Sequence, residues 1–340
     1  MFFLNLVYSL SDSLINMNNL IKTIKREISS ELNQYDSILI DSLNSDVKLI
    51  NTILKYILKY KGKQFRPILS ILSSKLENNP NDMTYISAAT VEMLHVATLL
   101  HDDVVDDAKI RRGWPTVNSI WKSKLAILVG DYMFSRSLSN IVKLKDLECI
   151  EILADISNRL SKGEILQIEN AINKEMSEKV FFKMIGDKTA SLISASCKLG
   201  FLSVNKSNKK ENISNFGEYL GIAYQLKDDL FDVMGKLDQM GKQTNLDLKK
   251  NLLTLPYIYV LNSVSMSDKK MIVRKMKYSS RKKDFKTVRK LVENYGGIEY
   301  TENKIKEFSD KAINELSVFD HSRYKDLLIE MLNFNLIRNY

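Results

Sequence analysis

Two stretches of this 340-residue chain carry closely spaced aspartates, and each ends a long apolar segment. "LLHDDVVDD" supplies Asp102, Asp103 and Asp106, and "YQLKDDLFD" supplies Asp228, Asp229 and Asp232. Carboxylates four residues apart share one face of a helix and repel each other there. A hard divalent cation reverses that repulsion, and Mg²⁺ suits oxygen ligands that leave positions open for phosphates. Each stretch therefore predicts part of a magnesium site.

Either stretch alone is also compatible with exposed carboxylates at a helix end. Acidic residues at the C-terminal end of a helix oppose the helix dipole, which weakens that explanation. The two stretches together are far more specific than either one. Two such helix ends facing each other across a cavity would hold a cluster of Mg²⁺ ions with a diphosphate between them.

Basic residues complete the pattern. Four short sequences supply them: "GKQFRP" with Lys63 and Arg66, "RRG" with Arg111 and Arg112, "DKTA" with Lys188 and Thr189, and "GKQT" with Lys242. Each basic residue alone is typical of a surface charge. Together they supply more point charges and guanidinium forks than one diphosphate needs, which predicts two diphosphate-bearing substrates.

The composition of the chain favours a large helical protein. It is 44% hydrophobic and 27% charged, and only 12 Gly and 4 Pro interrupt it. Apolar residues that recur every three or four positions therefore predict helices in one large domain. Two cysteines, Cys149 and Cys197, favour a reducing compartment without a disulfide framework. The net charge of +9 favours anionic partners, whether nucleic acid, membrane headgroups or phosphorylated small molecules.

Targeting signals are not evident in the sequence. The N-terminus, "MFFLNLVYSLSDSL", begins apolar but has no basic start and no small-residue cleavage site, so we do not expect a signal peptide. No window reaches the roughly 18 uninterrupted apolar residues of a membrane span. We therefore expect a soluble, cytoplasmic protein.

Helices must position the acidic and basic residues. One long, largely apolar helix is expected from Met83 to about Asp107, ending in the first aspartate stretch, and the next helix begins at "SKLAILVG". Further helices are expected at Cys149–Asn173, Ser177–Val204 and Ile213–Val233. The last of these ends in the second aspartate stretch. A basic helical hairpin at Lys269–Lys290 is expected to be solvated, since it has too few aromatic residues for a nucleic-acid surface.

These motifs resemble those of the trans-isoprenyl diphosphate synthases, the polyprenyl synthase family, over about Leu20 to Tyr340. "LLHDDVVDDAKIRRGWPTVN" is similar to the family's first aspartate-rich motif, "GEILQIENA" and "DKTASLISASCKLG" to its middle helices, and "YQLKDDLFDVMG" with "GKQTNLDLKKNLLTLP" to its second. The resemblance implies an all-α helical bundle around a central cavity. Residues 1–16 would be an N-terminal extension and residues 17–340 a single domain. It also implies a homodimer, and we expect transient membrane contact for product release but no nucleic-acid partner.

Matching motifs imply roles for individual residues. Mg²⁺ would be bound by Asp102, Asp106 and Asp228, with Asp103 and Asp232 supporting them and Asp229 in the same catalytic group. The allylic diphosphate would be held by Arg111, Lys188 and Lys242. Isopentenyl diphosphate would be held by Gly62, Lys63, Arg66, His95 and Arg112. Thr189 and Gln225 would lie along the reacting carbon. One departure is Leu252, where the family often has Lys; either Lys249 or Lys250 would substitute, or the pocket has one cation fewer.

The implied reaction joins an allylic diphosphate to successive isopentenyl diphosphates, and the cavity must then accommodate the growing chain. Thr98 and Ala97 lie four and five residues before Asp102, or about 6 to 7.5 Å along a helix. Short-chain members of the family tend to carry an aromatic residue there, so these small residues predict a long product, around octaprenyl, as for a quinone side chain. The deeper floor is expected at Met93, Phe134 or Leu138. A farnesyl or geranylgeranyl synthase is the alternative.

Three other functions share part of the pattern. A histidine–aspartate metal phosphohydrolase would use His95, His101 and Asp102, but the chain has only three histidines and the second aspartate stretch would have no role. A terpene cyclase usually replaces the second stretch with an Asn/Ser/Glu metal motif. A non-catalytic regulatory subunit would lack one or both stretches. Because both stretches are intact, the sequence favours chain elongation.

Overall fold

Helices make up nearly all of the chain that the computed structural model describes, which comprises residues 19–60, 62–173, 177–234, 252–277 and 282–337. The N-terminal half contains α2 (Ser29–Leu43), α3 (Lys48–Lys59), α4 (Phe65–Ser74), α5 (Asp82–Val105), α6 (Val117–Lys143) and α7 (Leu147–Asn173). The C-terminal half contains α8 (Glu178–Ile185), α9 (Ser191–Leu202), α10 (Lys209–Met234), α12 (Leu255–Ser263), α13 (Met266–Lys277), α14 (Lys282–Asn294), α15 (Gly297–Glu315), the 3₁₀ helix η3 (Leu316–Val318) and α16 (Arg323–Ile337). The all-α prediction is confirmed, and the extension predicted at residues 1–16 lies outside the described part.

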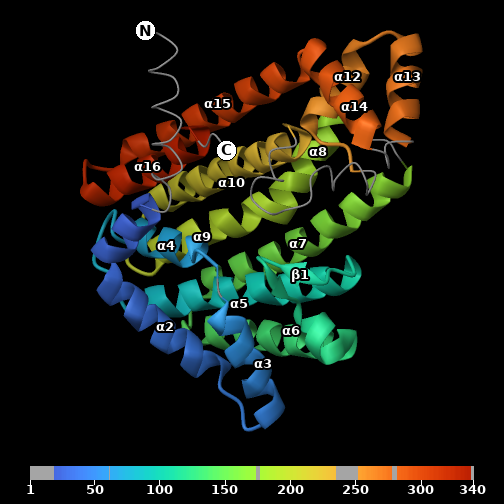
Figure 1. Cartoon of the computed structure of the whole chain (residues 1–340). Coiled ribbons are helices and arrows are strands. Elements are labelled where there is room, and N and C mark those ends of the chain that lie inside the picture. Colours follow the sequence, from blue (N-terminus) through green and yellow to red (C-terminus); the bar gives the residue numbers. More distant parts are fainter. Residues whose placement is uncertain (1–18, 61, 174–176, 235–251, 278–281, 338–340) are drawn as a thin grey trace.

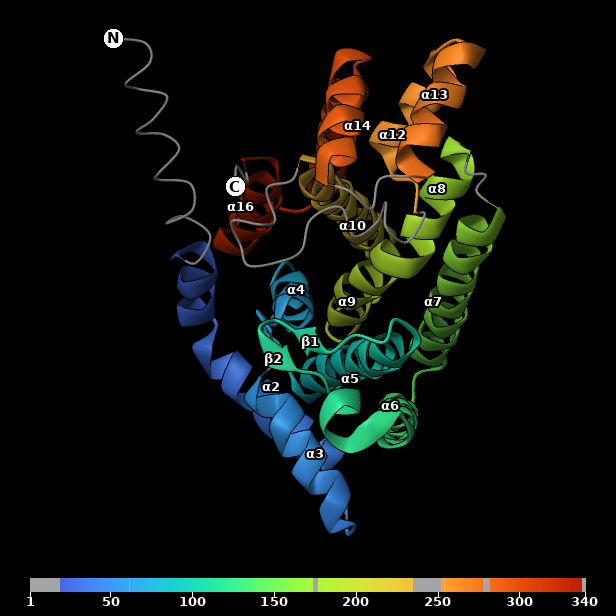
Figure 2. The same cartoon turned by 45° about the vertical axis from the view of Figure 1, so that its right-hand side comes forward.

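Helix α5 lies at the centre of the bundle, where it packs against α2, α4, α6 and α9 (Figures 1 and 2). A capping box begins it: the Asn81 side chain accepts hydrogen bonds from the backbone of Met83 and Thr84, and the Thr84 hydroxyl accepts one from the backbone of Asn81. Among the described helices it alone is long and apolar enough to cross a membrane, yet most of that segment is buried by its neighbours. The predicted central helix is therefore confirmed, with ends at Asp82 and Val105.

The remaining helices lie farther from α5, toward the two ends of the molecule or on its outer side. Helices α12, α13 and α14 form one end and α3 the opposite end (Figures 1 and 2). Helix α10 packs against both α9 and α15, and α7 packs against α9. The helices predicted at Cys149–Asn173 and Ile213–Val233 are α7 and α10, and the basic hairpin predicted at Lys269–Lys290 is α13 with α14.

A tight hairpin of two two-residue strands, β1 (Ile110–Arg111) and β2 (Trp114–Pro115), follows α5. Arg111 pairs with Trp114, and the two residues between them, Arg112 and Gly113, have φ values of 53° and 81°. Positive φ at both central residues is the requirement of a type I′ turn, whose twist suits two antiparallel strands. The sequence predicted only that the helix ends here. The hairpin turns both arginines back toward the end of α5, where they line a cavity with Asp103.

Two other elements differ from the regular helices that the sequence predicted. Helix α6 was expected to begin at Ser123; the structure adds a segment from Val117, and the helix is interrupted at Lys122, where φ is 69°. Between α8 and α9 the chain passes through a π turn, η1 (Gly186–Ala190), inside the predicted single helix Ser177–Val204. A π turn admits one extra residue per turn, and such turns occur frequently at functional sites.

Candidate active site

A cavity of about 830 Å³ is lined by residues of α4, α5, the β1–β2 hairpin, α6, α7, η1, α9 and α10. Many of the residues predicted for the active site line it, although they are distant in sequence. They are Arg66, His95, Ala97, Thr98, Asp102, Arg111, Arg112, Lys188, Thr189, Gln225 and Asp228. The two aspartate stretches therefore contribute to one cavity, as the sequence predicted.

Asp102, in the first aspartate stretch, has a strongly perturbed carboxyl group. Burial, together with the negative charge of Glu164 in the same cavity, raises its pKa from 3.8 to about 6, against the opposing effects of Lys188 and Arg111. The shift means that its ionised form is poorly solvated. A carboxylate in such surroundings gains more from a bound cation than an exposed one does.

Asp103 turns toward the hairpin. The Nε of Arg111 donates to both of its carboxylate oxygens, at 2.8 and 3.0 Å, and the side-chain amide of Asn118 donates to its backbone oxygen at 3.1 Å. Burial raises the pKa of Asp103, while the Arg111 guanidinium opposes that effect. Asp103 therefore holds Arg111 in place at the cavity wall.

Lys188 projects from the π turn onto α7. Its Nζ lies 2.7 Å from a carboxylate oxygen of Glu164 and 3.1 Å from the amide oxygen of Gln167. Both residues belong to the stretch "GEILQIENA", whose sequence pattern predicted no individual role for either of them. A single Glu on an amphipathic helix carries no distinctive spacing, and only the packing of α7 on η1 shows that it faces the cavity.

Thr189 is tied to the second aspartate stretch. Its hydroxyl donates to the side-chain oxygen of Gln225 at 2.8 Å, and the Gln225 amide nitrogen donates to Asp229 at 2.7 Å. Asp229 is buried, whereas Asp228 lies at the surface of the large cavity. On the same turn of α10, the buried Asp229 therefore orders Gln225 and Thr189, whereas Asp228 faces the cavity.

A cluster of cations lines the other wall. Burial, and then the positive charges of Arg66, Arg112 and Arg111, lower the pKa of His95 well below its usual 6.5. His95 is therefore a neutral imidazole at physiological pH. The Nε of Arg66 is buried and has no hydrogen-bond partner among the residues that the structure describes. Such a donor fits an anionic ligand.

The remaining predicted residues lie around this cavity. Gly62 lines a smaller cavity of about 110 Å³ with His95, Arg111 and Arg112, and a side chain at Gly62 would collide with the Arg112 guanidinium. An adjoining cavity of about 190 Å³ is shared by Lys188, Thr189 and Gln225 with Asp106, Asp229 and Leu252. Lys63 is exposed, and Asp232 is buried in α10. Lys242, Lys249 and Lys250 lie outside the described residues.

The apolar part of the large cavity extends along α5. Ala97 and Thr98 line it, together with Leu94 of the same helix. Of the three predicted floor residues, Phe134 also lines it, whereas Met93 lines the smaller cavity and Leu138 is 42% exposed on α6. The structure therefore favours Phe134 over the other two candidates.

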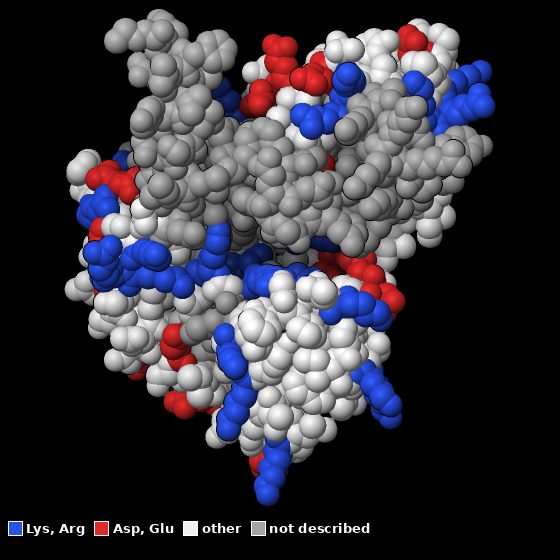
Figure 3. Space-filling model, in the orientation of Figure 1, with Lys and Arg blue, Asp and Glu red and all other residues white. Residues whose placement is uncertain are grey.

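Charge is distributed unevenly over the face that carries the hairpin. Lys and Arg side chains form a band across the middle of this face, at the height of α4 and β1, and Asp and Glu side chains gather at its right-hand end (Figure 3). Within the described ranges, no three His, Cys, Asp or Glu side chains lie close enough to form a metal site by themselves. Any metal bound by these aspartates therefore needs further ligands from elsewhere.

Comparison with known proteins agrees with this geometry. The polyprenyl synthetase family model matches residues 47–295. Octaprenyl diphosphate synthase from Escherichia coli (strain K12) is 30% identical over 302 residues, covering 88% of this chain and 94% of that enzyme. A decaprenyl diphosphate synthase structure from Rhodobacter capsulatus matches at 28% identity with a TM-score of 0.88, over 94% of this chain and 99% of that one. A polyprenyl synthase from Caulobacter crescentus CB15, complexed with calcium and isoprenyl diphosphate, matches at 29% identity with a TM-score of 0.85, over 94% and 98%. The chain belongs to the polyprenyl synthetase family and is a prenyltransferase.

Proposed function

We propose that this prenyltransferase extends an allylic diphosphate with successive isopentenyl diphosphates to an all-trans polyprenyl diphosphate of about octaprenyl length. The observation that carries the proposal is one cavity with acidic and basic side chains around one part and small or apolar side chains of α5, α6 and α7 around the rest. An octaprenyl and a decaprenyl diphosphate synthase among the relatives support a long product.

The proposed cofactor is Mg²⁺, held by Asp102, Asp106 and Asp228. The donor set fits this ion, because Mg²⁺ is usually bound through one or two carboxylates plus substrate phosphates rather than by an all-protein cage. Asp102 and Asp228 line one cavity, while Asp106 lines the adjoining one beside Lys188. Bound Mg²⁺ would neutralise negative charge on the departing diphosphate.

Two diphosphate subsites follow from the two groups of cations. Lys188 and Arg111 would hold the allylic diphosphate, as would Lys242. The other subsite, for isopentenyl diphosphate, consists of Gly62, Lys63, Arg66, His95 and Arg112. The Arg66 Nε without a partner supports the second assignment, because a diphosphate oxygen would satisfy it.

The reaction then requires no nucleophilic side chain. The allylic carbon–oxygen bond breaks and its electron pair leaves with the diphosphate. The double bond of isopentenyl diphosphate attacks the allylic carbon, and the resulting cation loses a proton to the released diphosphate. The Thr189 hydroxyl and the Gln225 amide are ordered by their mutual hydrogen bond, so their dipoles are fixed before positive charge develops. The apolar helices exclude water that would otherwise capture the cation.

The wider setting is part of the same proposal. We expect a cytoplasmic homodimer that contacts a membrane transiently to release its product, and we expect the product to become a quinone side chain. The support for the dimer is a set of exposed apolar side chains on α6, and the support for the quinone role is the proposed chain length alone.

One assay tests the proposal. The purified protein would be incubated with farnesyl diphosphate, labelled isopentenyl diphosphate and Mg²⁺, and its products identified by mass spectrometry. We expect a product of about eight prenyl units and no product when the metal is chelated. Products no longer than geranylgeranyl diphosphate would support the short-chain alternative, and no condensation at all would contradict the proposal.

A further inference from the structure

The π turn η1 presents two neighbouring residues, Lys188 and Thr189, to the large cavity. Both side chains are held at their ends, Lys188 by α7 and Thr189 by α10. The direction from which they enter the cavity depends on the backbone of the turn. A π turn is a rare and locally unfavourable conformation, so the surrounding helices must hold it.

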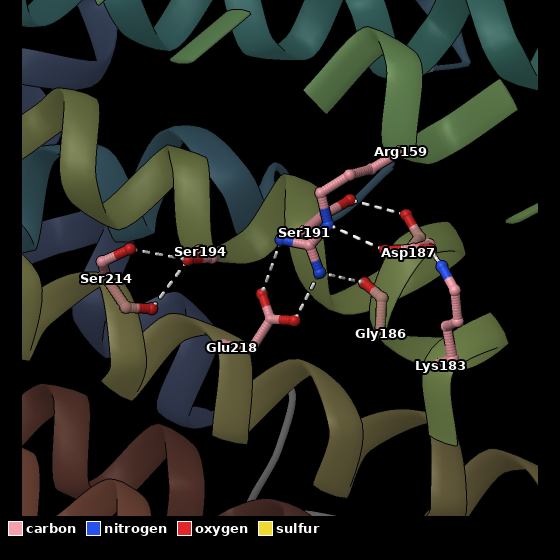
Figure 4. A network of polar contacts seen from close by, with 8 residues as sticks. All are labelled: Arg159, Lys183, Gly186, Asp187, Ser191, Ser194, Ser214 and Glu218. Carbon is pink, nitrogen blue, oxygen red and sulfur yellow. Dashed lines mark hydrogen bonds and ion pairs between the residues drawn. The ribbon is translucent and has the colours of Figure 1, made fainter. Parts of the chain in front are cut away.

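Arg159 of α7 binds the beginning of this turn (Figure 4). Its Nε donates to a carboxylate oxygen of Asp187 at 2.9 Å, and a terminal nitrogen donates to the backbone oxygen of Gly186 at 3.1 Å. The same terminal nitrogen lies 2.6 Å from Glu218 of α10, and the other lies 3.3 Å from it. Lys183 of α8 binds the second oxygen of Asp187 at 3.1 Å. One guanidinium thus joins α7, η1 and α10.

Helix α7 contacts successive parts of the turn with successive residues. Arg159 binds Gly186 and Asp187, and one helical turn later Gly163 lies against the backbone of Lys188. A Cβ at Gly163 would lie 2.7 Å from the Lys188 nitrogen, so only glycine allows this approach. The next residues on this face, Glu164 and Gln167, bind the Lys188 ammonium group.

Helix α10 repeats this arrangement on the other side of the turn. Glu218 binds Arg159, and three residues later Gly221 lies against Ala190, where a Cβ would come within 2.5 Å of the Ala190 Cα. Each helix therefore contributes one charged residue to the start of the π turn and one glycine that allows close packing. The ion pairs and the two glycines all contact the π turn η1, residues Gly186–Ala190, or the side chain of Arg159 that binds it.

We propose that Arg159 is a positioning residue, which, through Asp187 and Glu218, fixes the π turn so that Lys188 enters the cavity at the allylic diphosphate subsite. This inference rests on the proposed role of Lys188. Arg159 does not itself line the cavity; it acts through the backbone of the turn. Its planar guanidinium binds four acceptor atoms of three residues in fixed directions, which the single ammonium group of lysine does not do.

Arg159→Met tests the proposal by removing the donors while keeping most of the side-chain volume. Because a displacement of about 1 Å can reduce catalysis about 100-fold, we expect kcat/KM for the allylic diphosphate to fall about 10- to 100-fold. The KM for isopentenyl diphosphate should stay within about twofold, since its cations lie on other elements. Arg159→Lys should restore only part of the loss. If Arg159 had a purely structural role, Arg159→Met would lower the melting temperature without changing the ratio of kcat/KM for the allylic diphosphate to KM for isopentenyl diphosphate. That result would overturn the proposal.

A matched control is available far from the cavity. Arg323 of α16 pairs with Glu27 and Glu330, at 2.8 and 2.7 Å, so Arg323→Met also removes an arginine that joins two acids. We expect kcat/KM for the allylic diphosphate and KM for isopentenyl diphosphate in this variant to match those of the unaltered protein. If Arg159→Met does not yield folded protein, Glu218→Gln serves instead, because it removes one charge of the network and keeps its shape. The same selective loss is expected, and equal effects on both substrates would contradict the proposal.

A double-mutant cycle shows whether Arg159 acts through Lys188. In the Lys188→Ala background, Arg159→Met should cause less than about a twofold further loss, because the side chain that it positions is gone. Losses that multiply independently would overturn the proposal. Amide hydrogen exchange gives a readout without substrate: residues 186–190 should exchange faster in Arg159→Met than in Arg323→Met. If the unaltered protein shows no condensation but exchange still responds to Arg159, the proposed function fails while the positioning of the turn stands.

Discussion

Polar side chains of the cavity are held in pairs, and the pairs decide which charges face the substrates. Asp103 holds Arg111, Glu164 holds Lys188, and Gln225 joins Thr189 to Asp229. Residue motifs predicted the members that carry distinctive chemistry. They missed Glu164, because its importance comes from the packing of α7 on η1, and no local spacing encodes that contact.

Replacing either cavity-lining aspartate by its neutral isostere should separate activity from stability. We expect Asp102→Asn or Asp228→Asn to reduce turnover by at least about 100-fold, because a charged contact to the leaving group is lost. Burial raises the pKa of Asp102 to about 6, so at pH 7.5 its charge destabilises the fold, and Asp102→Asn should melt at the same temperature or higher. Calorimetry and a steady-state assay measure both effects.

The control for this pair is Asp107→Asn, which removes an exposed carboxylate one residue beyond Asp106. Its turnover should match that of the unaltered protein. Full activity of Asp102→Asn or Asp228→Asn would remove the metal assignment.

The two diphosphate subsites should respond to different substitutions. Arg112→Ala is expected to raise the KM for isopentenyl diphosphate, whereas Lys188→Ala should chiefly reduce kcat/KM for the allylic substrate, by about 100- to 1,000-fold. Steady-state kinetics with each substrate varied in turn distinguishes them. Exchanged effects would mean that the two subsites are reversed.

His95 should make stability depend on pH. Its pKa in the folded protein is well below the 6.5 of an unfolded chain, so the unfolded state takes up a proton that the folded state does not as the pH falls through 6.5. We expect the free energy of unfolding to decrease from pH 7.5 to 5.5, and to decrease less in His95→Asn. Urea titrations at both pH values measure this difference. His321→Asn, which alters an exposed ring, should keep the pH dependence of the original protein.

At the scale of elements, periodicity predicted most helices to within a few residues. Helix α5, for example, begins at Asp82, one residue before the predicted start at Met83, and the Asn81 side chain caps it there. The hairpin, the break at Lys122 and the π turn were missed. Each depends on backbone geometry imposed by neighbouring elements: Gly163 and Gly221, for example, lie in regular helices, and their importance is visible only where η1 packs against them.

The length of the apolar passage along α5 should set the length of the product. Ala97 is buried at the cavity wall, so Ala97→Phe is expected to block the passage and shorten the main product to about farnesyl or geranylgeranyl length while condensation continues. Phe134→Ala should have the opposite effect and lengthen it. Mass spectrometry of the products tests both.

Thr98→Val is the matched control, because it keeps the volume of a neighbouring cavity residue, and its product should be unchanged. An unaltered product in Ala97→Phe would contradict the idea that α5 limits chain growth.

At the scale of the molecule, one outer face of α6 is unusually apolar. Ile127, Leu128, Leu138 and Val142 are 42 to 58% exposed. At about 100° per residue they fall within about 100° of one another around the helix axis. A continuous apolar stripe of this kind favours burial against another protein surface, which supports the proposed second copy of the chain.

A charge on this stripe should separate the two copies. We expect the protein to sediment as a dimer at micromolar concentration and Leu138→Glu to sediment as a monomer, because a dimer would bury the introduced carboxylate. Analytical ultracentrifugation measures both. Ile313→Glu, on the distant helix α15, provides a comparison at similar exposure and should remain dimeric. A monomeric unaltered protein would contradict the dimer.

Helix α5 also has a consequence for synthesis of the protein on the ribosome. A nascent chain that has just exposed this helix presents a segment that meets the length and hydropathy requirements of a membrane anchor. The helices that cover it are α2 and α4, made before it, α6, made directly after it, and α9, made much later. Two of the four covering helices therefore already exist when α5 leaves the ribosome, and its apolar surface stays incompletely covered until α9 has been made.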